Sequence, residues 1–341
     1  MNVLIIGFGT AGKYYLNILR SFSKVKKVFI VDKVVHPRSS YYKQISFNSK
    51  ELKKNKINFA IVSTPSGSHY EYATKLLENS INLLIEKPFV LNLFEAKKLI
   101  LKAKDKKIKC WVVFQNRFNL AVKKLKSVVK KKSLGKIFLI DCSLIWKRDK
   151  KYYKSSWRGK YSSDGGVLTN QAIHLLDALV YIFGNVKKFN SILGFNKKKL
   201  NAEDLAVLNM CHEKGAITSF KATTRADSNY RSSMDVIGEK GRVLVKGISL
   251  NTFHYLKDNK IKDDKKNSEQ FGIGAGSIGA MGNGHLKILK EFFNNNLKRS
   301  SQNLEIQKNT HVLKLLHSIY NSNKKKLLCD VINKESILGK K

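Results

Sequence analysis

The chain has 341 residues, of which 43% are hydrophobic, a composition that excludes an intrinsically disordered protein and allows two packed domains. Its hydrophobic runs are shorter than the roughly 18 residues that span a bilayer, which excludes a transmembrane protein. The formal net charge is +40, with 65 lysine and arginine residues against 25 acidic ones. The four cysteines form no CxxC pair, so we expect neither a bound metal nor a disulfide framework.

Three interpretations compete for the excess of basic residues: nucleic-acid binding, attraction to an anionic substrate or membrane, and compositional drift. The lysines are spread over the whole chain, whereas nucleic-acid-binding proteins gather basic residues on one face or tail. We therefore favour drift and expect no specific nucleic-acid partner. The chain begins directly with a hydrophobic strand and shows no signal-peptide pattern, so we expect a cytoplasmic protein that does not insert into a membrane.

The first 120 residues alternate strand patterns with helix patterns. Strands are expected at 2–7, 27–32, 59–65, 82–88 and 109–114, and helices at 10–22, 68–79 and 93–107. This alternation predicts an α/β fold with a doubly wound parallel sheet, whose ligands bind at the carboxyl ends of the strands. We expect residues 1–120 to form a Rossmann domain that binds a dinucleotide.

After a basic helix at about 119–132 the pattern changes to consecutive strands. These are expected at 136–147, 186–195, 205–212, 215–224 and 231–237, the last joined by a GEKG turn to RVLVKG. Short turns between strands predict a large, mainly antiparallel sheet. Residues 266–284 are glycine-rich, and helices are expected at 285–297 and 305–321. Residues 121–341 are therefore predicted to form a second domain of the α+β type.

The segment GFGTAG (7–12) fits the pattern G-x-G-x-x-G between a strand and a helix. Its glycines permit a tight turn, a close approach to a pyrophosphate and close helix packing. Asp32 ends the second strand, where a carboxylate accepts the ribose hydroxyls of NAD. Lys33 and Arg38 leave NADP open as an alternative, and a glycine turn without a ligand is the competing interpretation. The cofactor contacts expected here are Gly7, Phe8, Gly9, Thr10, Ala11, Gly12 and Asp32.

Two further segments, STPSGSHYEYA (63–73) and EKP (86–88), end strands at the same edge of the sheet. Their polar residues are expected around the nicotinamide half of the cofactor because site residues gather at this edge. The contacts expected in this region are Thr64, Pro65, His69, Glu86, Lys87 and Gln115.

In the segment SSDGGVLTNQAIHLLDALVYIFG (162–184), the stretch after the paired glycines reads as one helix that is apolar on nearly every side. Asn170, His174 and Asp177 are spaced i, i+4, i+7 and are therefore expected to form one polar stripe along that helix. In one interpretation His174 is a core histidine that is hydrogen-bonded to Asn170 or Asp177. In the other the stripe faces a ligand.

The chain carries, in this order, the motifs GFGTAG, TPSGSH, EKP, QNRFN, GGVLTNQAIHLLD and NGH. With these motifs it resembles, over nearly its whole length, the Gfo/Idh/MocA family of NAD(P)-dependent sugar and polyol oxidoreductases. QNRFN (115–119), YYKSSWRGKY (152–161) and LTNQAIH (168–174) are most similar to the UDP-N-acetylglucosaminuronate 3-dehydrogenases of bacterial surface-polysaccharide synthesis. The resemblance implies NAD as the cofactor, and it implies that the polar stripe faces the substrate above the nicotinamide.

The resemblance also implies roles for the polar residues. His174 would be the base that takes the hydroxyl proton, Asp177 would orient its ring, and Lys87 would stabilise the developing alkoxide. Many members carry Asp four residues before this histidine, where the present chain has Asn170. Asn cannot accept the proton, so the catalytic roles fall on Lys87 and His174, and the product is a 3-keto sugar.

The loop at 146–161 interleaves aromatic and basic residues, which suits a nucleic-acid surface as well as the base, phosphates and carboxylate of a sugar nucleotide. In the family context we expect a small-molecule sugar nucleotide to bind there. The substrate contacts expected are Asn116, Arg117, Trp157, Arg158, Asn170 and Gln171.

Two alternative functions remain open from the sequence. One keeps the family and changes the substrate to a free sugar or inositol. The other is a non-enzymatic NAD-sensing or nucleic-acid-binding protein on a Rossmann scaffold, against which the pair Lys87 and His174 argues. From the family likeness we also expect residues 121–341 to bind substrate and to mediate oligomerisation. The expected homo-oligomer, a dimer or a tetramer, forms through the open face of the second sheet.

Overall fold

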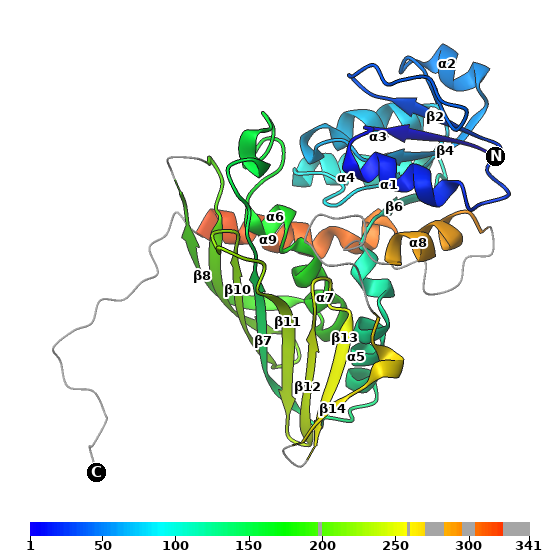
Figure 1. The fold of residues 1–341 in the computed structure, drawn as a ribbon. Coiled ribbons are helices and arrows are strands. Elements are labelled where there is room, and N and C mark those ends of the chain that lie inside the picture. Colours follow the sequence, from blue (N-terminus) through cyan, green and yellow to red (C-terminus); the bar gives the residue numbers. More distant parts are fainter. Residues whose placement is uncertain (197–199, 258–259, 270–282, 295–303, 323–341) are drawn as a thin grey trace, which may run out of the picture.

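The computed structural model describes residues 1–196, 200–257, 260–269, 283–294 and 304–322 (Figure 1). Within them the chain forms two sheets, and helices α8 (Gly284–Phe292) and α9 (Thr310–Ser322) lie between these sheets (Figure 1). Most of the glycine-rich stretch expected at 266–284 falls outside the described residues, as does the end of the helix expected at 285–297.

The first sheet has six parallel strands in the order β3-β2-β1-β4-β5-β6. Its strands are β1 (Asn2–Ile6), β2 (Lys27–Val31), β3 (Lys43–Gln44), β4 (Ile57–Val62), β5 (Asn82–Ile85) and β6 (Cys110–Val112). Its helices are α1 (Thr10–Leu19), α2 (Ser49–Lys54), α3 (His69–Glu78) and α4 (Leu93–Asp105). The prediction of a doubly wound parallel sheet is confirmed.

Strand β3 and helix α2 were not expected from the sequence. The strand has two residues and the helix six, so neither is long enough to show a hydrophobic period. The side chain of Asn48 starts α2 by accepting a hydrogen bond from the amide of Glu51. Such capping side chains define short helices that hydrophobic periodicity does not reveal.

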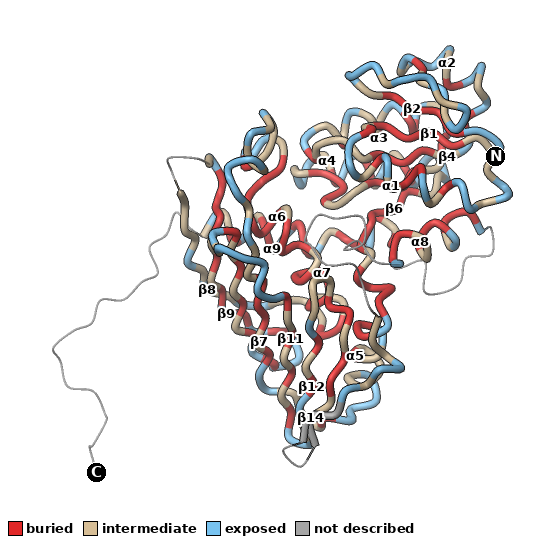
Figure 2. Tube along the Cα trace, in the orientation of Figure 1, coloured by how far each residue is buried: buried red, intermediate tan, exposed pale blue. Residues whose placement is uncertain are grey.

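The core of the first domain lies within its central strands. Val3, Leu4, Ile5 and Ile6 of β1 are completely buried, which requires helices on both faces of the sheet. Figure 2 shows buried residues along these strands and along the helices that cover the second sheet. This packing gives the carboxyl ends of β1, β4 and β5 a rigid support.

The second sheet has eight strands in the order β14-β13-β12-β11-β7-β10-β9-β8. Strands β7 and β10 pair in parallel and the other neighbours are antiparallel, so the prediction of a mainly antiparallel sheet is confirmed. The strands are β7 (Ile137–Ile145), β8 (Val186–Gly194), β9 (Leu205–His212), β10 (Ile217–Thr223), β11 (Arg231–Gly238), β12 (Gly241–Lys246), β13 (Thr252–Lys257) and β14 (Lys260–Asp263). The last two were not expected.

One face of this sheet is covered by helices, among them α5 (Leu120–Lys130) and α9, which pack on β13 and β8 respectively. No helix of the described residues packs on the other face (Figure 1). Ile192 and Ile217 on this face are 48% and 50% exposed. Oligomerisation through this face stays a prediction.

The helix expected after the paired glycines of the segment 162–184 is broken into α6 (Val167–Asn170) and α7 (Ile173–Phe183), so the prediction of one continuous helix is wrong. The backbone hydrogen bonds show where the helix is interrupted. The amides of Gln171 and Ala172 both bind the carbonyl of Val167, which inserts an extra residue into the turn. Consequently the i, i+4, i+7 geometry of an unbroken helix does not hold across this break.

The segment around α8 belongs in space to the first domain, although it follows the second sheet in sequence. The ring of Phe292 contacts Phe59 of β4 and Trp111 of β6, with centroids 5.5 Å and 5.3 Å apart. The boundary predicted at residue 120 stays a prediction, but the chain returns to the Rossmann sheet after leaving it.

Candidate active site

The glycine loop after β1 has the shape that a dinucleotide needs. Gly7 has a φ of +86°, and a Cβ on Gly12 would lie 2.2 Å from the carbonyl oxygen of Gly7. A Cβ on Gly9, in contrast, would meet nothing within 4 Å. The space in front of Gly9 and the start of α1 at Thr10 therefore suit a pyrophosphate at the helix N-terminus.

Asp32 lies directly after β2, next to this loop. Its carboxylate accepts hydrogen bonds from the amides of Phe8, at 2.5 Å, and Val34, at 2.8 Å. Burial raises the pKa of Asp32, but these amides and the nearby His36 outweigh burial, so the net pKa is lowered. Asp32 is thus an ionised acceptor at the position expected for a ribose.

His69 does not face the cofactor as expected. It is completely buried, and its ring nitrogens lie 2.9 Å from the carbonyl oxygen of Thr64 and 2.8 Å from that of Pro88. Both nitrogens are thereby occupied by backbone groups. His69 ties the loop after β4 to the loop after β5, which is a structural role beneath the site.

Glu86 is anchored by two residues that the sequence did not single out. Its carboxylate accepts a hydrogen bond of 2.6 Å from the hydroxyl of Tyr15 and lies 3.7 Å from Nε2 of His285. Burial raises the pKa of Glu86, but His285, Tyr15 and Lys87 outweigh burial and lower it to about 2. Glu86 therefore holds a negative charge directly beside Lys87.

Lys87 joins the two domains. Its Nζ donates to the backbone oxygen of Asn170 at 2.7 Å and to Oδ1 of the same residue at 3.3 Å. Burial lowers the pKa of Lys87, and the charges of Glu86 and Asp164 oppose that effect. The contact brings Lys87 of the first domain against α6 of the second.

His174 is partly buried in the first turn of α7. Its Nε2 lies 3.3 Å from Nε2 of Gln115, while its Nδ1 has no hydrogen-bond partner among the described residues. Burial, followed by the charge of Lys87, lowers the pKa of His174 well below its usual range. Since neither ring nitrogen is bonded to Asn170 or Asp177, the interpretation as a core histidine held by one of them is wrong.

Asp177 does not orient His174, which corrects the sequence prediction. Both of its oxygens accept hydrogen bonds from Arg117, at 2.8 Å from Nε and 2.5 Å from Nη2. Arg117 also donates to Asn309 and lies over the ring of Tyr181. At 8% exposure Arg117 is held in the interior, and the structure does not place it in a substrate cleft as expected.

The loop before α6 supplies a polar group close to Asn170. Gln171 and Asn170 both donate to the hydroxyl of Tyr152, at 3.0 Å and 3.2 Å. The guanidinium of Arg158 lies 3.9 Å from the centre of the Tyr152 ring and 4.3 Å from that of Trp157. Aromatic rings and a cation are thus stacked at the edge of the site.

Of the other expected contacts, Thr64 and Pro65 lie in the loop that follows β4, and Asn116 lies in the short 3-10 turn after β6. Asn116 is 6% exposed. Most of the residues expected around the nicotinamide therefore lie at the carboxyl ends of β4 and β5, at one edge of the first sheet.

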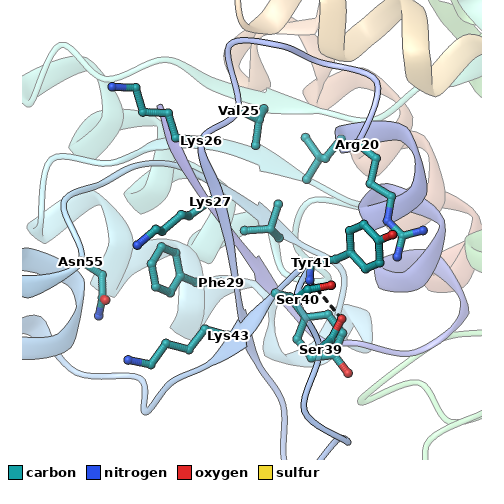
Figure 3. Close-up of a pocket in the computed structure, with 13 residues that line it drawn as sticks. Arg20, Val25, Lys26, Lys27, Phe29, Ser39, Ser40, Tyr41, Lys43 and Asn55 are labelled. Atoms are coloured by element: carbon teal, nitrogen blue, oxygen red, sulfur yellow. Dashed lines mark hydrogen bonds between the residues drawn. The ribbon is translucent and has the colours of Figure 1, made fainter.

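A separate pocket of about 480 Å³ lies elsewhere on the first domain (Figure 3). It is lined by the end of α1 and the start of β2, with Arg20 3.6 Å from the centre of the Tyr41 ring. These positions are at the amino end of β2, whereas the glycine loop lies at the carboxyl ends of the strands. The pocket is therefore not part of the candidate site.

No group of three or more His, Cys, Asp or Glu side chains in the described part of the chain is arranged to hold a metal ion. No helix described here combines the length and the apolar content needed to cross a membrane.

Family models match both parts of the sequence. One, described as "Oxidoreductase family, NAD-binding Rossmann fold", matches residues 1–114, and the other, described as "GFO/IDH/MocA C-terminal domain", matches residues 122–244. The fold and the glycine loop thus define an NAD-binding oxidoreductase. The chain belongs to the Gfo/Idh/MocA family. This confirms the predicted family, the predicted cofactor NAD and the prediction of an enzyme.

Individual relatives differ in what they act on. The chain is 26% identical to the uncharacterized oxidoreductase YhhX of Escherichia coli over 60% of each sequence. It is 22% identical to scyllo-inositol 2-dehydrogenase (NAD(+)) of Bacillus subtilis, over 71% of this chain and 72% of the relative. The crystal structure of the WlbA dehydrogenase from Bordetella pertussis, in complex with NADH and UDP-GlcNAcA, superposes with a TM-score of 0.82 at 23% identity. That match covers 97% of this chain and 98% of WlbA, and at this identity it shows the fold alone.

Replacing Arg117 with Ala should reduce stability, because it leaves the buried carboxylate of Asp177 without its cation. We expect a loss of about 3–5 kcal/mol in the free energy of unfolding, measured by urea denaturation. Lys130→Ala, which removes an exposed cation from α5, is the control and should cost little. A stable Arg117→Ala protein with a raised KM would instead support the substrate contact expected from the sequence.

Proposed function

We propose that the protein oxidises the C3 hydroxyl of a UDP-N-acetylglucosaminuronate-type sugar nucleotide, with NAD as cofactor. The observation that carries the proposal is that Lys87 of the first domain lies against the second domain. Its Nζ donates a hydrogen bond to Asn170, and its charge lowers the pKa of His174. A base and a fixed cation are the two groups that oxidation of a secondary alcohol requires.

The residues that would hold NAD are those of the glycine loop, together with Asp32. When bound, NAD supplies the acceptor for the hydride that leaves the alcohol carbon. The space in front of Gly9 supports this assignment, because a closed loop could not admit a pyrophosphate. Gln115, Glu86 and the loop with Thr64 would line the nicotinamide half.

His174 is the proposed base. Because its pKa is lowered, the ring is neutral at pH 7 and ready to take the hydroxyl proton, and Nδ1 has no other partner among the described residues. Lys87 is the proposed cation beside the substrate oxygen. Its ammonium stabilises the alkoxide as the proton leaves, and the charges of Glu86 and Asp164 favour this protonated form.

Two observations support a sugar nucleotide as the substrate. Arg158 stacked on Tyr152 and Trp157 offers a cation for a diphosphate or carboxylate and aromatic rings for a base. The fold match to WlbA covers almost the whole of both chains. The relative named for scyllo-inositol supports the alternative of a free polyol. Under our proposal the enzyme works in the cytoplasm, in synthesis of a bacterial surface polysaccharide.

Calorimetric titration separates these substrates. The protein, loaded with NAD, is titrated with UDP, UDP-N-acetylglucosaminuronate and myo-inositol at about 0.15 M salt, where exposed charges are screened. We expect Kd values of about micromolar for the UDP compounds, with the uronate bound more tightly than UDP. Binding of inositol without binding of UDP would retain the family and overturn the sugar-nucleotide substrate.

Replacing either proposed catalytic residue should impair turnover without loss of cofactor. We expect His174→Ala and Lys87→Ala each to lower kcat by about 100-fold or more, because general acid-base catalysis contributes on this scale. NAD affinity, measured by titration, should be nearly unchanged. Turnover close to that of the unmodified enzyme in either variant would remove that residue from the mechanism.

Arg158 should affect substrate binding more than chemistry. Its replacement with Ala removes a charge-assisted contact to the diphosphate or carboxylate, so KM should rise by about 10-fold, which corresponds to about 1.4 kcal/mol. Lys160→Ala removes an exposed cation from the same loop and is the matched control. Equal KM values for the two variants would show that only the overall charge of the loop matters.

A further inference from the structure

Asn170 lies between a lysine and a carboxylate, and each contacts a different end of its amide. Oδ1 and the backbone oxygen of Asn170 accept from Nζ of Lys87, at 3.3 Å and 2.7 Å. On the other side, Nδ2 donates to Oδ1 of Asp164 at 2.6 Å. Asp164 is 5% exposed and was not among the residues singled out from the sequence.

These neighbours fix the orientation of the amide. A lysine ammonium only donates hydrogen bonds, and an ionised carboxylate only accepts them. The oxygen of Asn170 must therefore face Lys87, and the nitrogen must face Asp164. The uncharged amide of Asn170 thus bridges the carboxylate of Asp164 and the ammonium of Lys87.

The same contact excludes a second carboxylate at this place. A carboxylate at position 170 would bring a second negatively charged oxygen to within about the same 2.6 Å of Asp164, whose side chain is buried. Two carboxylates so close cannot both be ionised without a large cost. As long as residue 164 is an aspartate, residue 170 must be neutral.

We propose that Asp164 is a positioning residue that acts through Asn170 to hold Lys87 in place and charged, and that Asp164 and Asn170 function as a pair. The claim about the pair stands on geometry alone. Its consequence for catalysis rests on the proposed function, in which Lys87 stabilises the alkoxide.

Other charges near Lys87 must be counted as well. Glu86 and Asp164 favour its charged form, whereas Arg158 and Arg148 oppose it. The charge of Lys87 in turn disfavours protonation of His174. The two carboxylates are held differently. Glu86 accepts a hydrogen bond from Tyr15 of the first domain, whereas Asp164 accepts one from Asn170 of the second domain, the residue that also contacts Lys87.

Thermal unfolding of four proteins tests the pair without any substrate: the unmodified protein, Asp164→Asn, Asn170→Asp and the double variant. Asn170→Asp should lower Tm by about 4 °C or more, because it buries two carboxylates side by side. The double variant exchanges the two groups, so that the amide at position 164 donates to the carboxylate at position 170, and it should recover most of that loss. Asn17→Asp on the exposed face of α1 and Asp105→Asn at the end of α4 are matched controls for the charge changes.

The link to Lys87 is tested in the same way. Asp164→Asn removes a negative charge that interacts with Lys87 more strongly than with Arg158. Its cost in Tm should therefore shrink in a Lys87→Met background, where the ammonium of Lys87 is absent. If the double variant recovers nothing, the pair is refuted. If the cost of Asp164→Asn is the same with and without Lys87, the action of Asp164 on Lys87 is refuted.

The pH profile of kcat gives a readout that a merely structural role would not move. Lys87 must stay protonated to act, so activity is lost as the pH rises through its pKa. Removal of the Asp164 charge lowers that pKa, so the alkaline limb for Asp164→Asn should move to lower pH by about one unit. In the double variant the limb should return toward its original place, and an unmoved limb in Asp164→Asn would contradict the proposal.

The two sets of measurements separate the hypotheses. If the unmodified protein turns over none of the substrates, the proposed function fails, while the unfolding experiments still decide whether Asp164 acts through Asn170 on Lys87. If turnover is present and the unfolding cycle shows no coupling, the inference about Asp164 fails and the proposed function stands.

Discussion

The site depends on one contact, the hydrogen bond from Nζ of Lys87 to the backbone oxygen of Asn170 at 2.7 Å. Lys87 is placed by β5, which ends at Ile85, and by a loop that His69 holds from below through Pro88. Asn170 is placed by the end of α6. A second contact supports the first, because the amide of Gly67 in the loop after β4 donates to the carbonyl of Ser163 at 3.0 Å.

Gly67 shows how closely the two domains approach here. A Cβ at this position would lie 2.2 Å from the carbonyl oxygen of Ser162, so a side chain would push the second domain away from the cofactor loop. The glycine in TPSGSH is therefore required by contact with the other domain. The distance between the proposed base and the proposed cation is consequently set by the packing of two domains, which no segment of the sequence contains alone.

The sequence was most informative where a function resides in contiguous residues. The glycine loop, Asp32 and the position of Lys87 after a strand could be predicted, because strand, turn and helix follow one another within a few residues. The order of the motifs was sufficient to identify the family.

Contacts between distant residues could not be predicted in this way. Arg117 and Asp177 are 60 residues apart, and Tyr15 and Glu86 are 71 apart. Whether such side chains meet depends on the rotation of helices and on the path of the chain between domains. Arg117 was therefore predicted to contact the substrate because it is a polar residue in a motif, whereas its partner in the structure is the buried carboxylate of Asp177.

The break between α6 and α7 has the same origin. The periodicity of residues 167–183 is that of a helix, and only tertiary structure reveals the interruption. The carboxylate of Glu203 accepts from the amide of Leu168 at 3.0 Å, and its backbone oxygen accepts from the amide of Val167. This residue thus satisfies the start of α6 from outside the segment. Because α6 is anchored by Glu203 and an extra residue precedes α7, Asn170 and Asp177 do not lie in one stripe. Asn170 contacts Lys87 and Asp164, whereas Asp177 contacts Arg117.

The charge of the whole protein and the charge of the site have different consequences. A net charge of +40 attracts any polyanion and accelerates its encounter with the surface, but it cannot distinguish one anion from another. Within the site, by contrast, cations and carboxylates alternate: Glu86 lies beside Lys87, and Asp164 contacts Asn170 opposite it. Because Asp164 is buried and Glu86, Lys87 and Asn170 are partly buried, salt screens these groups far less than it screens the surface lysines. Under the proposed function, discrimination between substrates therefore comes from these site residues and from the stacked loop with Arg158, while the basic surface contributes mainly to the rate of encounter.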